Sequence, residues 1–470
     1  MKILLLTPPY SIKERYNSKT DIKQGYLPPL GLAYIATFLE KEGEHEVQII
    51  DLQVEDYTLN ELIKKIKEFK PSIMGFSALT PTVNRAFSMA KEIKKAVDTP
   101  IIFGGAHVSC FPKETLENEK QIDIVVIKEG EHAMKEIAEY FEGRRDISSI
   151  KGIAYRNKNG GIEMTSPREM LQNLDDLPIP ERKYFDMSKY IPLPNQYKRK
   201  PITNMITTRG CSYGKCTYCF EAGRLGHKYR RISPQRAIEE IEYLVKNYHV
   251  KEIDFWDDEF VFDKRWVEEF CGLIIAKNID ICWSCYARVN FVNKEILKKM
   301  ADAGCWNIFY GLESGNQELL NKIKKGITLE QSRNAVKWAN EAGIETRGSF
   351  MLALPGETPE MGKKTINFAV SLGLDYAQFL LTTPFPGTEL FEQCKQEGRL
   401  SKNYDDYSVF KPVFIPNGYK NEKEITKLHK LAYRKFYLRP SYAMRHLKKI
   451  KTWTDVKKYA AAAKFIVGMS

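Results

Sequence analysis

The sequence predicts an α/β protein, in which a doubly wound parallel sheet is followed by a partial (β/α)6 barrel of the TIM type and a helical C-terminal extension. Three observations support this prediction. Short apolar runs alternate with helical patterns through residues 1–145, the alternation resumes with a longer period from residue 201, and residues 396–470 fit neither pattern. A chain of 470 residues is long enough for two or three domains with cores of their own.

The first region has the pattern of a sheet that helices cover on both faces. Nearly continuous apolar runs, as at residues 2–7 and 47–51, alternate with helical patterns such as residues 30–41 and 83–97. Strands of this kind are buried on both sides and run parallel. Ligands of such sheets bind beyond the carboxyl ends of the strands.

Four loops at those strand ends are rich in small or polar residues. They cover residues 7–10, 77–80, 104–107 and 128–132. Glycines there allow a ligand to approach the backbone closely, and hydroxyl and amide groups bind amides or phosphates. A tight turn would explain an isolated glycine pair, but four such loops on one edge favour a binding site.

Residues 146–200 break the alternation and mark a domain boundary. The runs at 153–156 and 162–165 flank an Asn-Lys-Asn-Gly-Gly sequence, which predicts a hairpin. The proline-containing stretches at 174–180 and 191–194 predict an extended connector.

The second alternating region predicts six strand and helix units without a closing pair, which is the pattern of a partial barrel. The strands are expected at residues 202–208, 252–256, 280–286, 306–311, 344–353 and 375–382. The helices are expected to begin near Pro234, Lys264, Asn293, Leu329 and Pro359. In such barrels the chemistry lies beyond the carboxyl ends of the strands.

Each of these six strand ends carries a reactive or ligand-like group. In chain order the groups are a cysteine triplet, an acidic run at 257–259, Arg288, a Gly-Leu-Glu-Ser-Gly stretch at 311–315, a Pro-Gly-Glu turn at 355–357, and residues 383–388. The sequence therefore predicts that polar groups converge at one mouth of the barrel.

Three of the nine cysteines, Cys211, Cys216 and Cys219, fall within nine residues after the first barrel strand. Three close thiolates suit an iron–sulfur cluster with one open iron, because a fully protein-held cluster or a structural zinc ion normally takes four ligands. The alternative is a zinc ribbon that adds Cys282 and Cys285. The gap of 62 residues is far longer than the roughly 15–20 of such sites, and the second pair lies on a predicted strand that points them to opposite faces.

Together these motifs resemble those of radical S-adenosylmethionine enzymes. The resemblance rests on the cysteine triplet after a first barrel strand and on the stretches at 311–315 and 354–357. The first region, with Gly-Gly-Ala-His at 104–107 and Glu-Gly-Glu at 129–131, looks like the cobalamin-binding domain of the class that combines both cofactors.

The resemblance covers about residues 1–395 and implies a division of the chain. Residues 1–145 would form a Rossmann-like cobalamin-binding domain, 146–200 a hairpin and linker, 201–395 the radical S-adenosylmethionine barrel, and 396–470 a basic helical C-terminal region.

The resemblance also implies a 4Fe–4S cluster held by Cys211, Cys216 and Cys219, with S-adenosylmethionine chelating the open iron. One electron would then cleave the sulfonium into methionine and a 5′-deoxyadenosyl radical. Glu313 is expected to accept hydrogen bonds from the ribose hydroxyls, and Arg288 to hold the methionine carboxylate.

Further cofactor-binding residues follow from the same resemblance. Asp257 stands after the second strand in place of the commoner glycine-rich pair, so it is expected to hold the amino group of S-adenosylmethionine, and Pro355 belongs to the same site. The residues expected at the cobalamin are Ser77, Gly104, Gly105, His107, Glu129 and Gly130. No lower cobalt ligand is assigned, because the Asp-x-His-x-x-Gly context is absent.

The triplet departs from the usual pattern in its spacing. Four residues, where the family usually has three, separate Cys211 from Cys216. Gly214 lies among them, and a glycine readily absorbs an extra residue in a loop. We therefore expect a bulged version of the same site.

The net charge of +12 belongs to the C-terminal region, where residues 411–470 hold 15 Lys and Arg against 3 Asp and Glu. A nucleic-acid enzyme more often carries its charge around the active site, so no nucleic-acid partner is expected. The basic amphipathic stretches at 424–438 and 442–450, with Trp453 beyond them, suit either an anionic membrane surface or a helical cap on the barrel.

The leading hypothesis is a cobalamin-dependent radical S-adenosylmethionine enzyme that methylates an unactivated carbon of a small-molecule or lipid-like substrate, with a reducing electron donor such as flavodoxin or ferredoxin. One alternative keeps both cofactors but performs cyclisation, oxidation or carbon–carbon coupling. Another is a non-enzymatic metal-binding nucleic-acid protein. The start of the chain, the lack of an apolar run of about 18 residues and the irregular cysteines predict a cytoplasmic location, with peripheral membrane contact left open.

Overall fold

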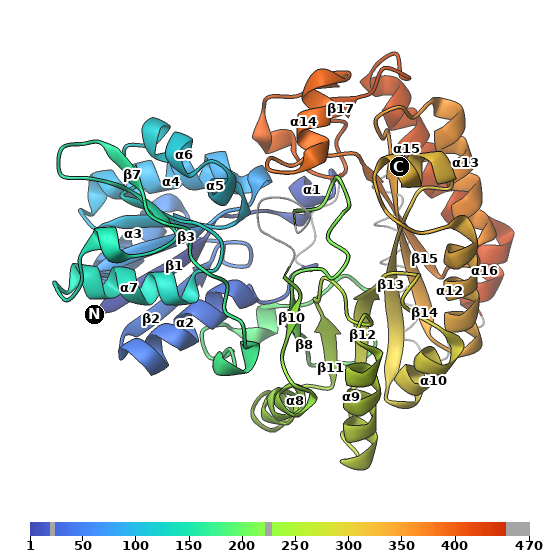
Figure 1. Cartoon of the computed structure of the whole chain (residues 1–470), viewed down its shortest axis with the longest axis horizontal. Coiled ribbons are helices and arrows are strands. Elements are labelled where there is room, and N and C mark those ends of the chain that lie inside the picture. The colour runs from blue at the N-terminus through green and yellow to red at the C-terminus, as the bar shows by residue number, and fades with distance from the viewer. Residues whose placement is uncertain (19–23, 221–227, 448–470) are drawn as a thin grey trace. The chain divides into compact units, whose positions relative to one another are not determined.

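The structure is a computed structural model that describes residues 1–18, 24–220 and 228–447. These residues form two compact units. Unit 1 holds residues 1–11, 26–190 and 403–407, and unit 2 holds the remaining described residues. Each unit is built around a sheet of mainly parallel strands (Figure 1). The domain boundaries expected from the sequence stay a prediction.

Unit 1 contains a seven-stranded sheet of order β2-β1-β3-β4-β5-β6-β7. Strands β1 to β5 pair in parallel, and β6 and β7 join antiparallel at one edge. The order turns back at β1, which places a topological switch point between β1 and β3. The strands are β1 (Lys2–Thr7), β2 (Glu46–Asp51), β3 (Ile73–Ser77), β4 (Ile101–Gly104), β5 (Ile124–Val126), β6 (Ile153–Arg156) and β7 (Ile162–Met164).

Helices cover both faces of this sheet, as the apolar strands require. The four residues from Ile3 to Leu6 are all buried, which means that both sides of β1 are covered. Helix α3 begins at a capping box between Thr58 and Glu61. The helices are α2 (Leu30–Gly43), α3 (Leu59–Phe69), α4 (Val83–Ala96), α5 (Ala106–Cys110), α6 (Pro112–Asn118) and α7 (Glu131–Phe141). The predicted doubly wound fold is confirmed.

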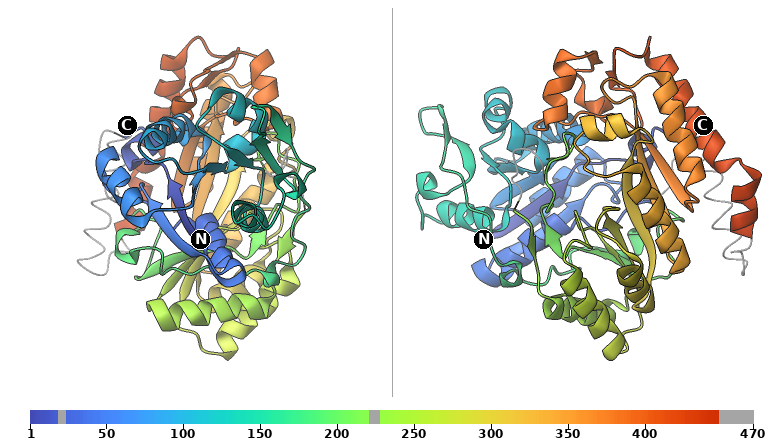
Figure 2. Two further views of the ribbon diagram at one scale, coloured as in Figure 1. Left: turned by 90° about the vertical axis from the view of Figure 1, so that its left-hand side faces the viewer. Right: turned by 45° about the vertical axis from the view of Figure 1, so that its right-hand side comes forward.

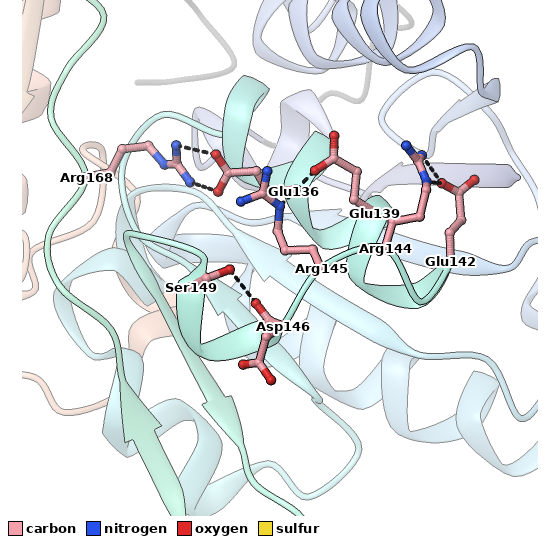
Figure 3. A network of polar contacts seen from close by, with 8 residues as sticks. All are labelled: Glu136, Glu139, Glu142, Arg144, Arg145, Asp146, Ser149 and Arg168. Atoms are coloured by element: carbon pink, nitrogen blue, oxygen red, sulfur yellow. Dashed lines mark hydrogen bonds and ion pairs between the residues drawn. The ribbon is translucent and has the colours of Figure 1, made fainter.

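A set of ion pairs braces the antiparallel edge of unit 1 (Figure 3). Arg168, which follows β7, forms a two-pronged contact with Glu136 on α7, with Nη1 3.1 Å from Oε1. Beside it, Arg145 donates to Glu139 at 2.8 Å. Partly exposed pairs of this kind contribute at most about 1 kcal/mol each, so their main effect is to fix the hairpin against α7.

Unit 2 contains six parallel strands in the order β15-β14-β13-β12-β11-β8. Neighbours in the sheet are neighbours in the chain, and β8 and β15 do not pair, so the barrel is partial as predicted. The strands are β8 (Ile202–Met205), β11 (Glu252–Phe255), β12 (Cys282–Ala287), β13 (Cys305–Glu313), β14 (Glu345–Leu352) and β15 (Tyr376–Leu381). Two short ladders pair β9 (Thr208–Arg209) with β10 (Arg230–Arg231), and β16 (Arg399–Leu400) with β17 (Phe414–Ile415).

The crossover helices lie along the outer side of this sheet (Figures 1 and 2). They are α8 (Pro234–Tyr248), α9 (Lys264–Ala276), α10 (Lys294–Asp302), α12 (Leu329–Glu341) and α13 (Pro359–Ser371), and side chains cap their first turns at Ser233, Asp263, Asn293, Thr328 and Thr358. Such caps satisfy backbone donors that the first turn leaves unpaired. Shorter helices are α1 (Ile12–Arg15), α11 (Gln317–Lys322) and α14 (Glu389–Gln396).

The amphipathic pattern near residue 424 forms α15 (Glu422–Tyr437), and α16 (Pro440–Leu447) follows it. Helix α15 covers the edge strand β15. The hydroxyls of Tyr433 and Tyr437 and the ring of His429 hydrogen-bond the backbone of Phe379 and Ala377. These contacts satisfy backbone groups that an edge strand would otherwise leave open. Trp453 lies outside the described residues.

Candidate functional site

The cysteine triplet lies on the loop after β9, beyond the carboxyl end of β8. Two glycines shape this loop, since the φ angles of Gly210 and Gly214 are 82° and 52°. A Cβ at position 210 would lie 2.5 Å from the carbonyl oxygen of Lys228. The loop therefore requires glycine at 210, and Gly214 adopts a conformation that glycine takes without strain.

The thiol of Cys216 is buried, whereas Cys211 and Cys219 are half-buried. Burial raises the pKa of Cys211, and the backbone N–H groups of Gly214 and Tyr213 oppose that rise by hydrogen bonding to its sulfur. A metal that replaces the proton removes this cost, because the thiolate is the ligand form.

The donor atoms of the triplet are thiols, which suit an iron–sulfur cluster. Across the described ranges, no three His, Cys, Asp or Glu side chains lie close enough to form a site for a metal ion. A four-iron cluster spreads its ligand sulfurs further apart than a single ion does, and cysteine thiolates are its usual ligands. Three cysteine thiols on one short loop are a donor set that suits such a cluster. Cys282 and Cys285 of the alternative zinc ribbon are buried on β12.

Tyr213 lies between Cys211 and Cys216, and its side chain packs against Arg288 and a neighbouring turn. Its ring lies 3.9 Å from the guanidinium carbon of Arg288, and its hydroxyl donates to the carbonyl of Lys324 at 2.9 Å. Gly326, at φ 65°, has no room for a side chain, since a Cβ there would be 2.2 Å from the Tyr213 hydroxyl. Tyr213 is thus held between Arg288 and the Lys324–Gly326 turn.

Glu313 lies at the end of β13 and forms a buried cluster with Lys325 and Tyr218. Its Oε1 accepts hydrogen bonds from Lys325 Nζ at 2.8 Å and from the Tyr218 hydroxyl at 3.0 Å. Lys325 Nζ also lies 3.0 Å from the Tyr218 oxygen. Burial and the neighbouring Glu313 carboxylate raise the pKa of Tyr218 well above its ordinary value, so Tyr218 stays a neutral donor.

Gly311 makes room for this cluster. A Cβ at that position would lie 2.6 Å from Glu313 Oε1 and 2.7 Å from Lys325 Nζ. The carboxylate and the ammonium therefore sit directly over the backbone of β13, which explains the glycine in the Gly-Leu-Glu stretch.

Sequence reasoning missed Lys325 and Tyr218. Lys325 follows Glu313 by twelve residues, past the short helix α11, and a Lys-Lys-Gly sequence there resembles an ordinary solvated turn. Tyr218 lies between two of the cysteines, and this position inside the triplet could have identified it as a residue of the site.

Arg288 connects the cysteine loop to the Lys325 turn. Its Nη1 lies 3.7 Å from Cys216 Sγ, and its Nη2 donates to the carbonyl of Lys325. Its backbone N–H donates to Glu259 at 2.9 Å. The expected contact between Arg288 and the methionine carboxylate stays a prediction. In the structure the same guanidinium contacts Cys216 and hydrogen-bonds the carbonyl of Lys325.

The acidic residues at 257–259 accept hydrogen bonds from the backbone of neighbouring segments. Asp257 Oδ1 accepts from the backbone N–H groups of Thr207 and Thr208 at 2.6 and 2.9 Å, and Asp258 accepts from that of Gly210 at 3.0 Å. Burial raises the pKa of Asp257, and these hydrogen bonds oppose the rise. Asp257 thus holds the strand that leads into the cysteine loop, and its contact with an amino group stays a prediction.

The turn that contains Pro355 is rigid. Ala353 and Gly356 have φ angles of 62° and 78°. The buried carboxyl of Glu357 accepts hydrogen bonds from the Ala353 N–H at 2.7 Å and the Tyr419 hydroxyl at 2.6 Å. Burial raises the pKa of Glu357 to about 7. The turn is therefore held in place at the end of β14, where Pro355 is expected to contact the cofactor.

In unit 1, Ser77 and Gly104 are paired neighbours at the ends of β3 and β4. A Cβ on Gly104 would meet nothing within 4 Å, so there is open space beside it. Gly105, at φ 103°, is different, because a Cβ there would lie 2.7 Å from the Ala78 carbonyl oxygen. Open space beside a bare backbone fits the close approach of a large cofactor.

His107 is enclosed by other side chains of unit 1. Its Nδ1 lies 3.3 Å from the Thr80 hydroxyl, and its ring contacts those of Tyr404 and Phe111 at centroid distances of 4.8 and 5.4 Å. Burial lowers the pKa of His107 to about 4, so the ring is neutral at neutral pH. No local pattern could have revealed Tyr404, which comes from the distant segment 403–407.

Glu129 and Gly130 follow β5 and lead into α7. Lys128 has a φ angle of 72°, and its N–H donates to the Ser109 hydroxyl at 3.0 Å. Gly130 is the N-cap of α7, where a Cβ would lie 2.8 Å from Ile35 Cδ1. Packing therefore already explains a glycine at 130, and the contact of Glu129 and Gly130 with cobalamin stays a prediction.

Two family models match the chain. The model of the radical SAM superfamily matches residues 205–369, and that of the B12 binding domain matches residues 23–138. Among curated proteins, an uncharacterised methyltransferase of Pyrococcus horikoshii is 36% identical over 95% of both chains. The anaerobic magnesium-protoporphyrin IX monomethyl ester cyclase of Rubrivivax gelatinosus is 26% identical over 94% of this chain and 78% of its own.

Solved structures resemble the chain over most of its length. TsrM of Kitasatospora setae, a radical S-adenosylmethionine methyltransferase with cobalamin and a [4Fe-4S] cluster bound, superposes with a TM-score of 0.71 at 21% identity, covering 93% of this chain and 85% of its own. OxsB, with aqua-cobalamin and S-adenosylmethionine bound, gives 0.72 at 18% identity over 100% and 71%. At these identities the likeness shows the fold.

Proposed function

The chain belongs to the cobalamin-binding radical S-adenosylmethionine enzymes, and we propose that within this family it transfers a methyl group to a carbon atom of a small-molecule substrate. The expected cofactors, a 4Fe–4S cluster, S-adenosylmethionine and cobalamin, are confirmed by the two family models together. Chemistry of this class also needs a reducing electron donor, for which flavodoxin or ferredoxin is our proposal.

The observation that carries methyl transfer is the identity of 36% with a methyltransferase over 95% of both chains. When bound, the cluster supplies the electron that cleaves S-adenosylmethionine, and cobalamin supplies a transferable methyl group. The residues of this chain hold and orient these groups. We assign the cluster to Cys211, Cys216 and Cys219.

We assign Glu313 to the ribose of S-adenosylmethionine. Lys325 and Tyr218 both bind Oε1 of this carboxylate. That arrangement holds the carboxylate through Oε1, and we assign Oε2 to the ribose, because a group that only accepts hydrogen bonds suits two hydroxyls. We assign Arg288, Asp257 and Pro355 to the rest of the same cofactor, and the loops at Ser77, Gly104, Gly105, His107, Glu129 and Gly130 to cobalamin.

A second candidate function is radical cyclisation without methyl transfer. The similarity to the cyclase of Rubrivivax gelatinosus, at 26% identity over 94% of this chain, favours it over other reactions. Both candidates use the same cofactors, so the products distinguish them.

The experiment is anaerobic reconstitution of the full chain with iron, sulfide, cobalamin, S-adenosylmethionine and a reductant, followed by analysis of cofactor products and of candidate substrates. S-adenosylhomocysteine together with a substrate mass gain of one methylene supports methyl transfer, whereas deoxyadenosine without methylation supports cyclisation. Cys216→Ala is expected to lose the four-iron spectrum. Cys394→Ala, a buried thiol on α14, is the matched control and should keep it. Tightly bound zinc without iron contradicts both candidates.

Peripheral membrane contact is a separate proposal. Leu431, Leu438 and Met444 are exposed on or between α15 and α16, and basic residues accompany them. Across the described ranges no helix is both long and apolar enough to span a bilayer. Deletion of residues 441–470 should weaken sedimentation with anionic vesicles, and unchanged sedimentation would exclude membrane contact through these residues.

A further inference from the structure

The inner face of the unit 2 sheet carries a buried cation, Arg347 on β14. The preceding residue, Thr346, faces the outer helices, since its hydroxyl lies 3.5 Å from Asn340 Oδ1 on α12. Successive side chains of a strand point to opposite faces. Arg347 therefore projects from the inner face, and only 4% of it is exposed.

The guanidinium of Arg347 is fixed but incompletely paired. Its Nε donates to Asn307 Oδ1 at 2.6 Å, and its carbon lies 5.3 Å from the centre of the Phe309 ring. Its Nη2 is buried and has no hydrogen-bond partner within the described part of the chain, and the same holds for Asn307 Nδ2. Two neighbouring N–H donors on one buried face thus lack acceptors.

No carboxylate of the described residues forms an ion pair with Arg347. Asp254 is an acid within electrostatic range of Arg347, since burial raises the pKa of Asp254 and the charge of Arg347 opposes the rise. Its two oxygens already accept hydrogen bonds from Ser284 at 2.6 Å and from the Trp256 indole at 2.7 Å. The charge of Arg347 also acts on the phenols of Tyr286 and Tyr16, where it opposes the rise in pKa that burial causes. Burying a cation without a hydrogen-bonded anion is unfavourable, so the site favours an anionic ligand.

The position of Arg347 along the sheet is also informative. Arg347 pairs with Phe309 of β13, which precedes Gly311 by two residues. Gly311 lies beneath the Glu313–Lys325 pair. At about 3.3 Å per residue, Arg347 lies roughly 7 Å along the sheet from that pair. A small molecule that reaches from one to the other brings its carbon skeleton to the S-adenosylmethionine site.

We propose that Arg347 and Asn307 bind an oxyanion of the substrate, a carboxylate or a phosphate, at the inner face of the sheet. The planar guanidinium and the adjacent amide offer donors with the geometry that such anions accept. This inference rests on the proposed function, because it treats the inner face of the barrel as the place of the substrate.

The test uses the reconstituted full chain and measures its thermal midpoint in inorganic phosphate, in acetate and in chloride at equal ionic strength. We expect phosphate or acetate to raise the midpoint by about 2 °C over chloride, because an anion that binds the folded state stabilises it. The anion with the larger effect identifies the class of oxyanion. Equal midpoints in all three salts would overturn the proposal.

Two variants and a control make the test specific. Arg347→Gln removes the charge, and Asn307→Asp places a carboxylate beside Arg347 as an internal partner that does not threaten folding. Both should abolish the anion effect. Arg333→Gln on α12, whose guanidinium bonds Ser371 at 3.1 Å and lies 4.8 Å from the Phe368 ring, should keep it. An anion effect that survives in Asn307→Asp would also overturn the proposal.

Failure of this inference can be distinguished from failure of the proposed function. Cleavage of S-adenosylmethionine by the wild-type protein is measured in parallel. Its absence speaks against the proposed function, whereas the anion titration alone decides whether Arg347 and Asn307 bind an oxyanion.

Discussion

Lys325 Nζ lies 2.8 Å from Glu313 Oε1, and both side chains are 7% exposed. The pair joins the end of β13 to the turn that Tyr213 and Arg288 contact. Burying two charges is costly unless they are paired and hydrogen-bonded, and here Tyr218 supplies a further contact to each. The relationship therefore couples the carboxylate assigned to the ribose with the loop assigned to the cluster.

Lys325→Met should destabilise unit 2 by about 3–5 kcal/mol, because it leaves the Glu313 carboxylate buried without its cation. It should also weaken the binding of S-adenosylmethionine. Chemical denaturation and equilibrium binding measure the two effects. The matched control is Lys324→Met, which breaks a pair with Glu389 in which the side chains are 54% and 46% exposed, and should cost at most about 1 kcal/mol. Equal losses in the two variants would contradict the role assigned to Lys325.

Gly326→Ala should reduce the iron content of the reconstituted protein. The new Cβ would collide with the Tyr213 hydroxyl and displace Tyr213 from its place beside Arg288. Gly343→Ala is the control for backbone strain alone, since its φ angle is 81° and a Cβ there meets nothing within 4 Å. Iron and sulfide assays after anaerobic reconstitution compare the two. Normal iron content in Gly326→Ala would mean that Tyr213 does not help to shape the cluster loop.

Gly104→Ala should leave unit 1 folded but weaken cobalamin binding. The added methyl group enters open space beside Ser77, which we assign to the cofactor. Gly272→Ala on α9 of unit 2 adds a methyl group to equally open surroundings and should not change affinity. Absorbance titration with hydroxocobalamin measures both. If both variants bind as tightly as the wild type, the cofactor does not occupy the space beside Gly104.

The contribution of Glu357 to the stability of the protein should fall as the pH rises from about 4.5 to 7. Burial raises the pKa of Glu357 from 4.5 to about 7 in the folded state. Between these values the folded state holds more protons than the unfolded state, so raising the pH favours unfolding, by up to about 3 kcal/mol for this group. Above pH 7 the penalty stays constant.

Glu357→Gln removes this contribution while keeping an acceptor for the Ala353 N–H. Thermal midpoints across the pH range should show a flatter profile for the variant than for the wild type. Glu360→Gln, at an exposed position on the next helix, is the control and should keep the wild-type profile. Parallel profiles for the wild type and Glu357→Gln would show that Glu357 does not titrate in this window.

The alternation of apolar runs was sufficient to predict both sheets, because strands buried on two faces have a distinctive composition. The cysteine triplet, Glu313 and Arg288 could be located for a similar reason, since each lies at the end of a strand or shortly after it. The family models confirm the cofactors that the resemblance implied.

Contacts between distant segments were beyond the reach of the sequence. Tyr404 packs on His107, although almost 300 residues separate them in the chain. In the sequence, Arg347 is one polar residue of a predicted strand, and its partner Asn307 belongs to another strand. Asp257 and Asp258 hold backbone amides of neighbouring segments, which the sequence did not reveal, and the contact of Asp257 with an amino group stays a prediction. A buried carboxylate can accept hydrogen bonds from backbone N–H groups or from a ligand, and composition alone does not distinguish these two roles.

The central claim is that Cys211, Cys216 and Cys219 hold a four-iron cluster with one iron open to S-adenosylmethionine. Electron paramagnetic resonance of the reduced, reconstituted protein tests it most directly. We predict a four-iron signal whose g values shift when S-adenosylmethionine is added and which Cys216→Ala loses. A four-iron signal that S-adenosylmethionine leaves unchanged, or one that survives in Cys216→Ala, would contradict the claim.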